Sequence, residues 1–367
     1  MNNRIFTLSW RLCSIVLCAV TAALYLPVTA HSQDAGFFDG KTVNVYIGRG
    51  PGSGTDIALR TFIDHWQKHI PGGPTFVIRN IPGGGGTRVW NYGYEVAKPD
   101  GLTLMFSPFS GASEILRLPG LRADFSRMPL IGGLKSPNLV YIRRPDVSEP
   151  ADIMTISGLK YAGQNPAHHY DILGRLAMDM LGIDYVYITG FAGADAVFNA
   201  VRRGEVEMQT AGLTLYRFSI EPTLIESGEA IPLWHNPRVD GDGNIVPEEA
   251  AEGIPTFVEV YEELKGVAPS GEEFEGYKWL QPTINTFGHA AFMPPDSPVA
   301  VVEILRESFR ATTEDSAFRE EEAKLFGVRM PLIEHAEGTR IVQQMSKPPA
   351  YVRELLERYA GQGGGSQ

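Results

Sequence analysis

Two glycine-rich stretches have the residue types that bind anions. The first is "GRGPGSGTD", residues 48–56, which lies between the alternating apolar "TVNVYI" and the helix-like "IALRTFIDHW". The second is "IPGGGGT", residues 81–87, at the next strand–helix junction. A glycine-rich turn at a helix N-terminus presents backbone N–H groups and a partial positive charge. The two stretches therefore favour an anion site over the plainer alternative, tight turns that only start helices.

The spacing argues against the two common nucleotide loops. A Rossmann fingerprint fails at its last position whether it is counted from Gly48 or from Gly50. A P-loop needs a lysine, and none lies between Lys41 and Lys68. Pro51 also lacks the amide that a tight phosphate turn would use. A carboxylate fits the loops better, because it accepts several N–H bonds and needs no cation.

The elements that position these loops follow from hydrophobic periodicity. Period-two alternation predicts strands at 42–48, 75–80 and 102–107, and helical periodicity predicts helices at 55–70 and 88–98. Strand and helix alternate, so we expect a parallel sheet with right-handed crossovers. The carboxyl ends of its strands would bring both glycine loops to one crevice. A second α/β unit is expected to begin near residue 145.

The N-terminus has the three-part pattern of a secretory signal peptide. Two arginines precede an apolar run at 12–26, and small residues then allow cleavage near Ala30. An uncleaved membrane anchor is the alternative, but the run is short for a span. Both cysteines, Cys13 and Cys18, lie inside this segment. The mature chain therefore lacks disulfides, thiol catalysis and cysteine–zinc sites.

The charge balance limits the class of partner. The formal net charge of the 367-residue chain is −11, and removal of Arg4 and Arg11 with residues 1–30 makes it −13. So acidic a surface argues against nucleic acid as a partner. It leaves a small anionic ligand possible, because backbone amides can make one pocket locally positive.

Longer stretches resemble one known family. "GPGSGTDIALR", "VIRNIPGGGGT" and "KPDGLTL" are followed in order by "LKYAGQNPAHHYDILGRLAMDMLGIDYVYITGFAGADAVFNAVRRGEVEMQ", "GIPTFVEV" and "AFMPPDSPVAVVEIL". This order and spacing, over about residues 41–345, resembles the substrate-binding proteins of tripartite tricarboxylate transporters. These proteins are the Bordetella uptake gene products, or TctC-like periplasmic solute receptors. The resemblance implies the type II periplasmic-binding-protein fold, with a ligand cleft between two α/β lobes.

The resemblance also implies a division of the chain. Residues 1–30 would be the signal peptide, and residues 41–142 with 289–357 would form lobe 1. Residues 143–288 would form lobe 2. Within this lobe, the Gly-, Pro- and Glu-rich composition of residues 237–276 predicts an acidic surface insertion. Residues 358–367 would be a flexible tail.

The matching loops give the expected ligand-binding residues. In the family the first two loops hold a ligand carboxylate, and the other loops contact the rest of the molecule. Carried onto this chain, the expected residues are Arg49, Gly52, Ser53, Gly54, Thr55, Asp56, Gly84, Gly85, Gly86, Thr87, Ser107, Phe109, Ser110, Asn165, His168, Phe191, Ala192, Gly193, Asp195, Gln209 and Thr210.

Several of these residues have equally plausible structural roles. Arg49 could clamp a carboxylate in bidentate fashion or form a surface ion pair. Asp56 is better placed to cap its helix than to touch an anion. Phe109 and Phe191 could flank an apolar ligand body or pack in the core. Ser53 stands where the family usually has glycine, so its hydroxyl could join the amides.

The function expected from the resemblance is capture, without chemistry, of a di- or tricarboxylate, an aromatic carboxylate or an amino acid. The expected partners are the membrane subunits of a tripartite tricarboxylate-type transporter, and the protein is expected to be a monomer without cofactor or metal. His65 with His69, and the "DGDGN" run at 240–244, are better explained as surface and turn residues than as metal ligands. An exported hydrolase and a ligand sensor of the same fold are the alternatives.

Overall fold

The computed structural model describes residues 36–240, 242–285, 287–327 and 329–361. The expected signal peptide lies outside these ranges. Within them, no helix is long and apolar enough to cross a membrane.

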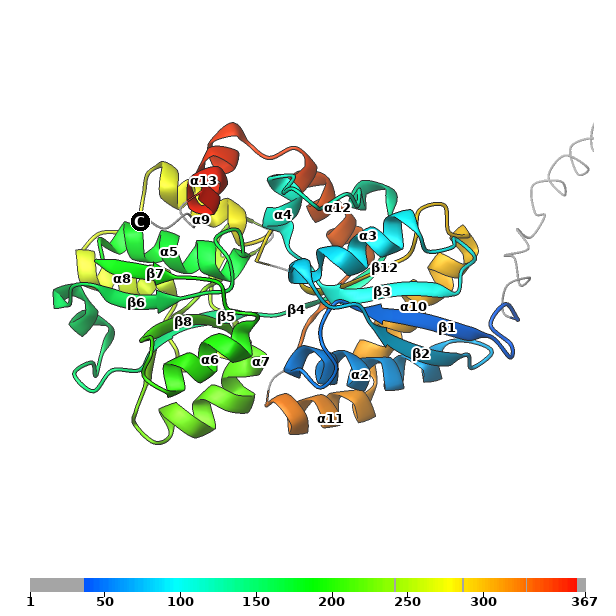
Figure 1. Ribbon diagram of the computed structural model, residues 1–367, viewed down its shortest axis with the longest axis horizontal. Coiled ribbons are helices and arrows are strands. Elements are labelled where there is room, and N and C mark those ends of the chain that lie inside the picture. Colours follow the sequence, from blue (N-terminus) through cyan, green and yellow to red (C-terminus); the bar gives the residue numbers. More distant parts are fainter. Residues whose placement is uncertain (1–35, 241, 286, 328, 362–367) are drawn as a thin grey trace, which may run out of the picture. The chain divides into compact units, whose positions relative to one another are not determined.

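Two mixed sheets organise the described chain (Figure 1). The first has the strand order β13-β4-β12-β3-β1-β2, and the second has the order β7-β6-β8-β5-β9. The strands of the first sheet are β1 Thr42–Ile47, β2 Thr75–Asn80, β3 Thr103–Pro108, β4 Leu130–Lys135, β12 Phe287–Phe292 and β13 Leu332–Ile333. Those of the second are β5 Asn138–Ile142, β6 Leu159–Ala162, β7 Tyr185–Ile188, β8 Met208–Gly212 and β9 Ile231–His235. A separate hairpin pairs β10 Arg238–Val239 with β11 Ile245–Val246.

Helices cover both faces of each sheet. They are α2 Gly54–Trp66, α3 Thr87–Glu95, α4 Gly111–Ile115, α5 His169–Leu181, α6 Ala194–Arg202, α7 Leu213–Leu215, α8 Phe257–Lys265, α9 Glu272–Leu280, α10 Val299–Glu314, α11 Ser316–Phe326, α12 His335–Ser346 and α13 Ala350–Gly361. Figure 1 shows α2 and α11 on one side of the first sheet and α3 on the other. In the second unit, α5 and α6 both pack against β8 and lie on opposite sides of its sheet.

The sequence predicted parallel sheets, but both sheets also contain antiparallel pairs. Parallel pairing joins β1 to β2 and β3, and β6 to β7 and β8. By contrast, β12 is antiparallel to β3 and β4, and β5 is antiparallel to β8 and β9. The crossover rule constrains only successive strands joined by a helix. Neither β12 nor β5 is joined to its neighbours in that way.

Within the described residues, the chain passes from a strand of one sheet to a strand of the other at two places. The first passage is at residues 136–137, so β5 belongs to the second sheet and not to the first unit, where the sequence had placed it. The second passage precedes β12. Buried amides connect the two passages: Asn138 Nδ2 donates to Asn285 Oδ1, and Asn236 Nδ2 donates to Asn138 Oδ1. Tyr277 Oη donates to Asn236 Oδ1 at 2.7 Å and completes the chain of bonds.

The last helix lies against the second unit. α13 packs on α5 and α9, although its residues were expected in lobe 1 up to 357 and in a flexible tail beyond. Arg175, on α5, explains the docking, because its Nη1 donates to the carbonyl of Tyr359 at 2.9 Å. The guanidinium also lies 4.3 Å from the Tyr187 ring centroid. Fully buried, Arg175 is stabilised by carbonyl acceptors and aromatic faces.

The 237–276 segment is more than the acidic surface excursion that its composition suggested. It contains α8 and the start of α9, and α8 packs against β9 and α5. Phe257 and Val260 are fully buried on α8, which begins with a Thr256–Glu259 capping box. The acidic residues therefore cover the outer side of helices whose inner side belongs to the core.

Phe62 is central to the core between α2 and the first sheet. Its ring contacts those of Trp66, Phe106, Phe309 and Phe318, with centroids 4.5–5.9 Å apart. We expect Phe62→Ala to lower the free energy of unfolding by about 3–5 kcal/mol, because the cavity is surrounded by rings that cannot collapse into it. Urea denaturation measures the change.

Phe218 provides the matched control, because its side chain is 54% exposed. Phe218→Ala should change the free energy of unfolding by no more than about 0.5 kcal/mol. Equal losses in the two variants would contradict the central role of Phe62.

Candidate functional site

A buried carboxylate organises the first glycine loop. Asp56 accepts hydrogen bonds from the backbone N–H of Gly52 (2.9 Å) and from Asn80 Nδ2 (2.7 Å). It also forms an ion pair of 2.8 Å with Arg60. Burial alone would raise the pKa of Asp56, but the hydrogen bonds from Arg60, Asn80 and Gly52 lower it below its usual value. Asp56 thus orients the loop, and its carboxylate is occupied within the protein.

The N-terminus of α2 keeps two amides free. Ser53 is the N-cap: its hydroxyl accepts from the N–H of Asp56 (3.2 Å) and donates to the carbonyl of Gly50 (3.0 Å). The serine hydroxyl is therefore used for capping. Among the described residues, the N–H groups of Gly54 and Thr55 have no acceptor. These two amides, with the positive end of the α2 dipole, are available to an anion.

The second glycine loop forms a short 3₁₀ turn, η3 Gly84–Gly86, before α3. Gly84 and Gly86 have φ values of 60° and 105°, which a residue with a side chain rarely adopts. The Thr87 hydroxyl donates to the carbonyl of Gly84 at 2.7 Å. Gly85 lies within this turn. Arg88 Nη1 donates to the carbonyl of Pro82 at 3.0 Å. The loop therefore holds its shape through glycine conformations and these two side-chain bonds.

Three strand ends meet where the glycine loops begin. A Cβ added to Gly48 would lie 2.6 Å from Ser107 Oγ and 3.3 Å from Gly86 Cα. The N–H of Gly48 donates to Ser107 Oγ at 3.1 Å. The ends of β1 and β3 and the loop after β2 are therefore in close contact, and Ser107, fully buried, has a structural role there.

The loop after β3 divides its predicted residues between core and surface. Phe109 is 2% exposed, and its ring packs against Trp90, Phe125 and Phe287. It is a core residue. Ser110, which precedes α4, is half-buried and accepts a hydrogen bond from Ser113 Oγ at 3.1 Å.

In the second unit, the residues predicted on β8 have structural roles. Gln209 accepts from Tyr141 Oη at 2.9 Å and donates to the carbonyl of Ala194 at 2.9 Å. The Thr210 hydroxyl is hydrogen-bonded to Tyr161 Oη at 2.8 Å. Both side chains are buried and paired within the protein.

The loops of the second unit keep their predicted residues accessible. Asn165 is exposed, and His168 is half-buried beside Gln164 Nε2 (3.2 Å from His168 Nε2). The turn before α6 contains a half-buried Phe191, an exposed Ala192 and the N-cap Gly193, followed by an exposed Asp195. No hydrogen bond or ion pair engages the Asp195 carboxylate within the described part of the chain.

Arg49 follows β1 directly and is half-buried. Its guanidinium makes no hydrogen bond or ion pair to any described residue, although its carbonyl accepts from Asn80 Nδ2 at 2.8 Å. Burial lowers the pKa of Arg49, while Tyr170 and Asp195 partly raise it. An arginine from the first unit therefore faces the electrostatic field of the second.

Two further residues near Arg49 were not among those predicted. His169 begins α5 and His289 lies on β12, and both are buried. The Nδ1 atom of each ring is buried without a hydrogen-bond partner among the described residues. His169 could have been found from the adjacent His168. His289 lies in "FGHAAF", which has no local signal beyond that of a buried strand.

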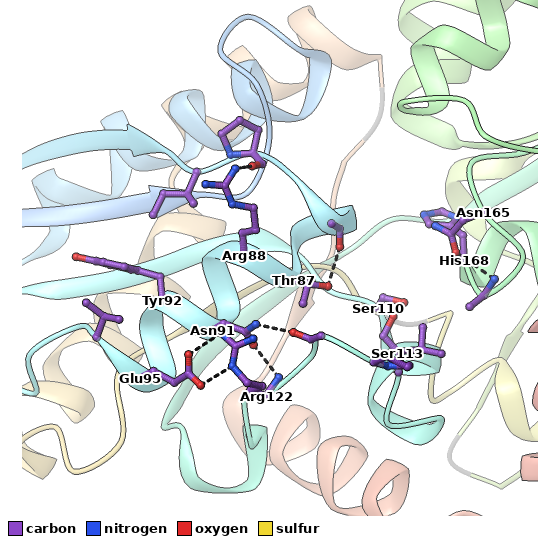
Figure 2. A pocket seen from close by; sticks show the side chains of 18 of the residues that line it. Thr87, Arg88, Asn91, Tyr92, Glu95, Ser110, Ser113, Arg122, Asn165 and His168 are labelled. Carbon is purple, nitrogen blue, oxygen red and sulfur yellow. Dashed lines mark hydrogen bonds and ion pairs between the residues drawn. The ribbon is translucent and has the colours of Figure 1, made fainter.

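A cavity of about 1120 Å³ extends along α3 (Figure 2). Of the predicted residues, it is lined by Gly84, Thr87, Ser110, Asn165 and His168. Figure 2 shows Ser110 and Ser113 between Thr87 and His168. The cavity thus joins the second glycine loop to the loop before α5. Much of its remaining wall is α3 and the loop after α4, residues 118–122.

The described residues contain no group of three or more His, Cys, Asp or Glu that could hold a metal ion. His65 pairs with Glu321 (2.8 Å) and His69 with Asp315 (2.7 Å). Asp240 accepts the N–H groups of Asp242 and Asn244, which is the polar turn expected there.

Comparison with known proteins places this geometry in a known fold. No family model matches the chain, and no curated protein matches its sequence. Among solved structures, the periplasmic binding protein BugD has 18% identity and a TM-score of 0.62, over 88% of this chain and 98% of that one. The chain has the fold of the periplasmic binding proteins. The two-lobed α/β fold predicted from the sequence is thus confirmed.

Other structures of the same type agree. MatC from Rhodopseudomonas palustris, with bound malate, is 18% identical with a TM-score of 0.62, over 86% of this chain and 99% of that one. A second R. palustris protein, with adipate, is 17% identical with a TM-score of 0.63, over 88% of this chain and 97% of that one. These neighbours, with a TctC solute-binding protein from Polaromonas, match the family that the sequence resembles.

The Asp56 carboxylate should make stability depend on pH. Its folded-state pKa is lowered, so its contribution is present above the unfolded pKa of about 3.9 and is lost as the pH falls through the folded value. We expect Asp56→Asn to lower the free energy of unfolding at neutral pH by about 1.5–3 kcal/mol. The difference in the free energy of unfolding between variant and wild type should become smaller in acid. Urea denaturation across the pH range measures it.

Asp242→Asn is the matched control, because that carboxylate is exposed. This variant should follow the wild-type curve at every pH. If the difference in the free energy of unfolding between Asp56→Asn and wild type is the same in acid as at neutral pH, the loop does not require the charge of Asp56.

Proposed function

We propose that the protein is a periplasmic solute receptor for a small organic carboxylate. The ligand would be a di- or tricarboxylate, an aromatic carboxylate or an amino acid. It would be held between the two units and delivered, unchanged, to the membrane subunits of a tripartite tricarboxylate-type transporter. Ligand contacts to both units would favour the closed arrangement over the open one.

The observation that carries this proposal is a set of unpaired donors. The amides of Gly54 and Thr55 and the guanidinium of Arg49 lie in one continuous segment, and all lack acceptors among the described residues. Nearby polar groups such as Asp56 and Ser53 are fully used inside the protein. The carboxylate oxygens of an organic anion supply the acceptors that these donors lack.

The fold supports the same function. MatC and the second R. palustris protein have this fold with malate and with adipate. The signal peptide expected from the sequence of residues 1–30 would direct the receptor to the periplasm, where it would meet such a ligand before the ligand crosses the inner membrane. A monomer without cofactor is sufficient for capture and release.

A thermal-shift screen tests the receptor function directly. Ligand that binds only the folded state stabilises it by about 2.7 kcal/mol at a hundredfold excess over the dissociation constant. We expect at least one of a broad panel of mono-, di- and tricarboxylates and amino acids to raise the melting temperature. A panel without any shift, or turnover of ester or sugar substrates, would refute the proposal.

Gly54→Pro tests the amide contact itself. Proline at the first helical position removes one N–H and leaves the helix intact, and the extended backbone of Ser53 (ψ 157°) accepts a following proline. Loss of a hydrogen bond to a charged group corresponds to about 10- to 100-fold in affinity. We expect the dissociation constant of the carboxylate found in the screen to rise by that factor, measured by calorimetry.

Gly54→Ala is the control, because it keeps the N–H and a Cβ there meets no atom within 4 Å. The alanine variant should bind like the wild type. If proline and alanine variants bind equally well, the α2 amides do not hold the ligand.

A further inference from the structure

Three nitrogen-bearing side chains around the strand ends lack hydrogen-bond partners. They are Arg49, His169 and His289, and none has a hydrogen bond or ion pair to a described residue. His169 is 6% exposed and His289 is 7% exposed. Buried polar side chains normally have partners, so two unpaired histidines near one unpaired arginine form an unusual group.

Register and contacts place the three residues close to one another. On β12, His289 pairs with Pro108, the last residue of β3. The β1–β3 register pairs Tyr46 with Met105, and its continuation brings Arg49 level with Pro108. Arg49 and His289 therefore lie on opposite sides of the end of β3.

The second unit brings His169 to the same place. The ring of Tyr170 lies 4.3 Å from that of His169, and its hydroxyl donates to Ser136 Oγ at 3.2 Å. Ser136 is packed against Gly288, the residue before His289: a Cβ added to Gly288 would lie 2.2 Å from Ser136 Cβ. Contacts thus run continuously from His169 through Tyr170 and Ser136 to His289.

Leaving these groups unpaired is unfavourable. A buried polar group without a partner costs about 1–3 kcal/mol, and a buried charge costs more. The cost is removed when an anion accepts hydrogen bonds from the guanidinium and the imidazoles. The glycine loops already offer amides for one carboxylate, so this group would hold another part of the ligand.

We propose that Arg49, His169 and His289 form a second anion subsite, and that ligand binding there is coupled to uptake of a proton by one of the histidines. This inference rests on the proposed receptor function and assigns its second set of contacts. The ligand class is a small molecule with two anionic groups, one at the α2 amides and one at this subsite.

The direction of the coupling follows from the charges. Burial, and secondly the neighbouring His168 and Arg49, lower the pKa of His169 well below its usual value. Burial, followed by the charge of Arg49, lowers the pKa of His289 to about 4. Both rings are therefore neutral near pH 7. An anion beside them favours the imidazolium, so binding should take up a proton and strengthen as the pH falls.

Other charged groups surround the subsite and belong in this balance. His168, Tyr170 and Asp171 lie on or beside the start of α5, and Asp195 lies in the first turn of α6. On β4, Lys135 is 3.9 Å from Glu337. None of these groups forms a hydrogen bond with the unpaired donors. Burial lowers the pKa of Arg49, and Tyr170 and then Asp195 partly offset that lowering.

Calorimetry of the protein tests the subsite. The probes are succinate, glutarate and adipate, each against the monocarboxylate of equal carbon number. We expect the best dianion to bind at least about tenfold more tightly than its monoanion partner. Its binding heat should differ between Bis-Tris and Tris buffers at one pH, in the sense of proton uptake, because neither buffer is an anion that competes for the subsite. Its affinity should rise up to about tenfold per pH unit of acidification.

Variants then separate binding from structure. His169→Leu and His289→Leu remove unpaired polar rings, so the free energy of unfolding should stay equal or rise. The affinity of these variants for the dianion should fall about 10- to 100-fold, and their affinity for the monoanion should change little. The dependence of the binding heat on the buffer should diminish. His69→Asn is the control. His69 follows the end of α2 and pairs with Asp315, so this variant should bind the dianion like the wild type.

Each result decides between two statements. If a dianion binds with buffer-independent heat, or if the leucine variants keep the full dianion preference, the subsite is refuted and the receptor function stands. If neither mono- nor dianions bind in this or the wider screen, the receptor function fails and the subsite with it.

Discussion

Buried side-chain amides must find hydrogen-bond partners, and asparagines with this requirement lie at the two places where the chain passes from one sheet to the other. Asn138 begins β5 directly after the first passage, and Asn285 stands just before β12 at the second. Their side-chain bond, continued through Asn236 to Tyr277, satisfies groups that would each cost about 1–3 kcal/mol if unpaired. The two passages are thereby held together.

The same criterion separates the structural polar residues from those that we propose bind a ligand. Asp56 and Gln209 are buried and use their acceptors and donors inside the protein, so they shape the loops that they occupy. Arg49, His169 and His289 are at least half-buried and use none within the described chain. Residues of both kinds lie close together at the strand ends. What distinguishes them is whether their hydrogen bonds are already made.

Local patterns were enough to predict β1, α2 and the glycine loops, because alternation, capping and glycine content are encoded within a few residues. Contacts between distant segments were not predictable in this way. The antiparallel placement of β5 depends on β8 and β9, and the docking of α13 depends on Arg175. Phe109 shows the same limit: an aromatic residue after a strand has the same local signature whether it faces a cleft or, as here, four other core rings.

In the proposed receptor, Arg49 would contribute to ligand binding only if its guanidinium remains charged and keeps its N–H groups free. Burial lowers the pKa of Arg49 and works against the charge, whereas Asp195 raises it from the first turn of α6. Because Asp195 is exposed and makes no hydrogen bond to Arg49, it supports the charge without occupying the guanidinium. A direct ion pair would have been more favourable for the empty protein and would have competed with the ligand. In the proposed receptor, the separation of Asp195 from Arg49 would therefore favour ligand binding over the stability of the unliganded state.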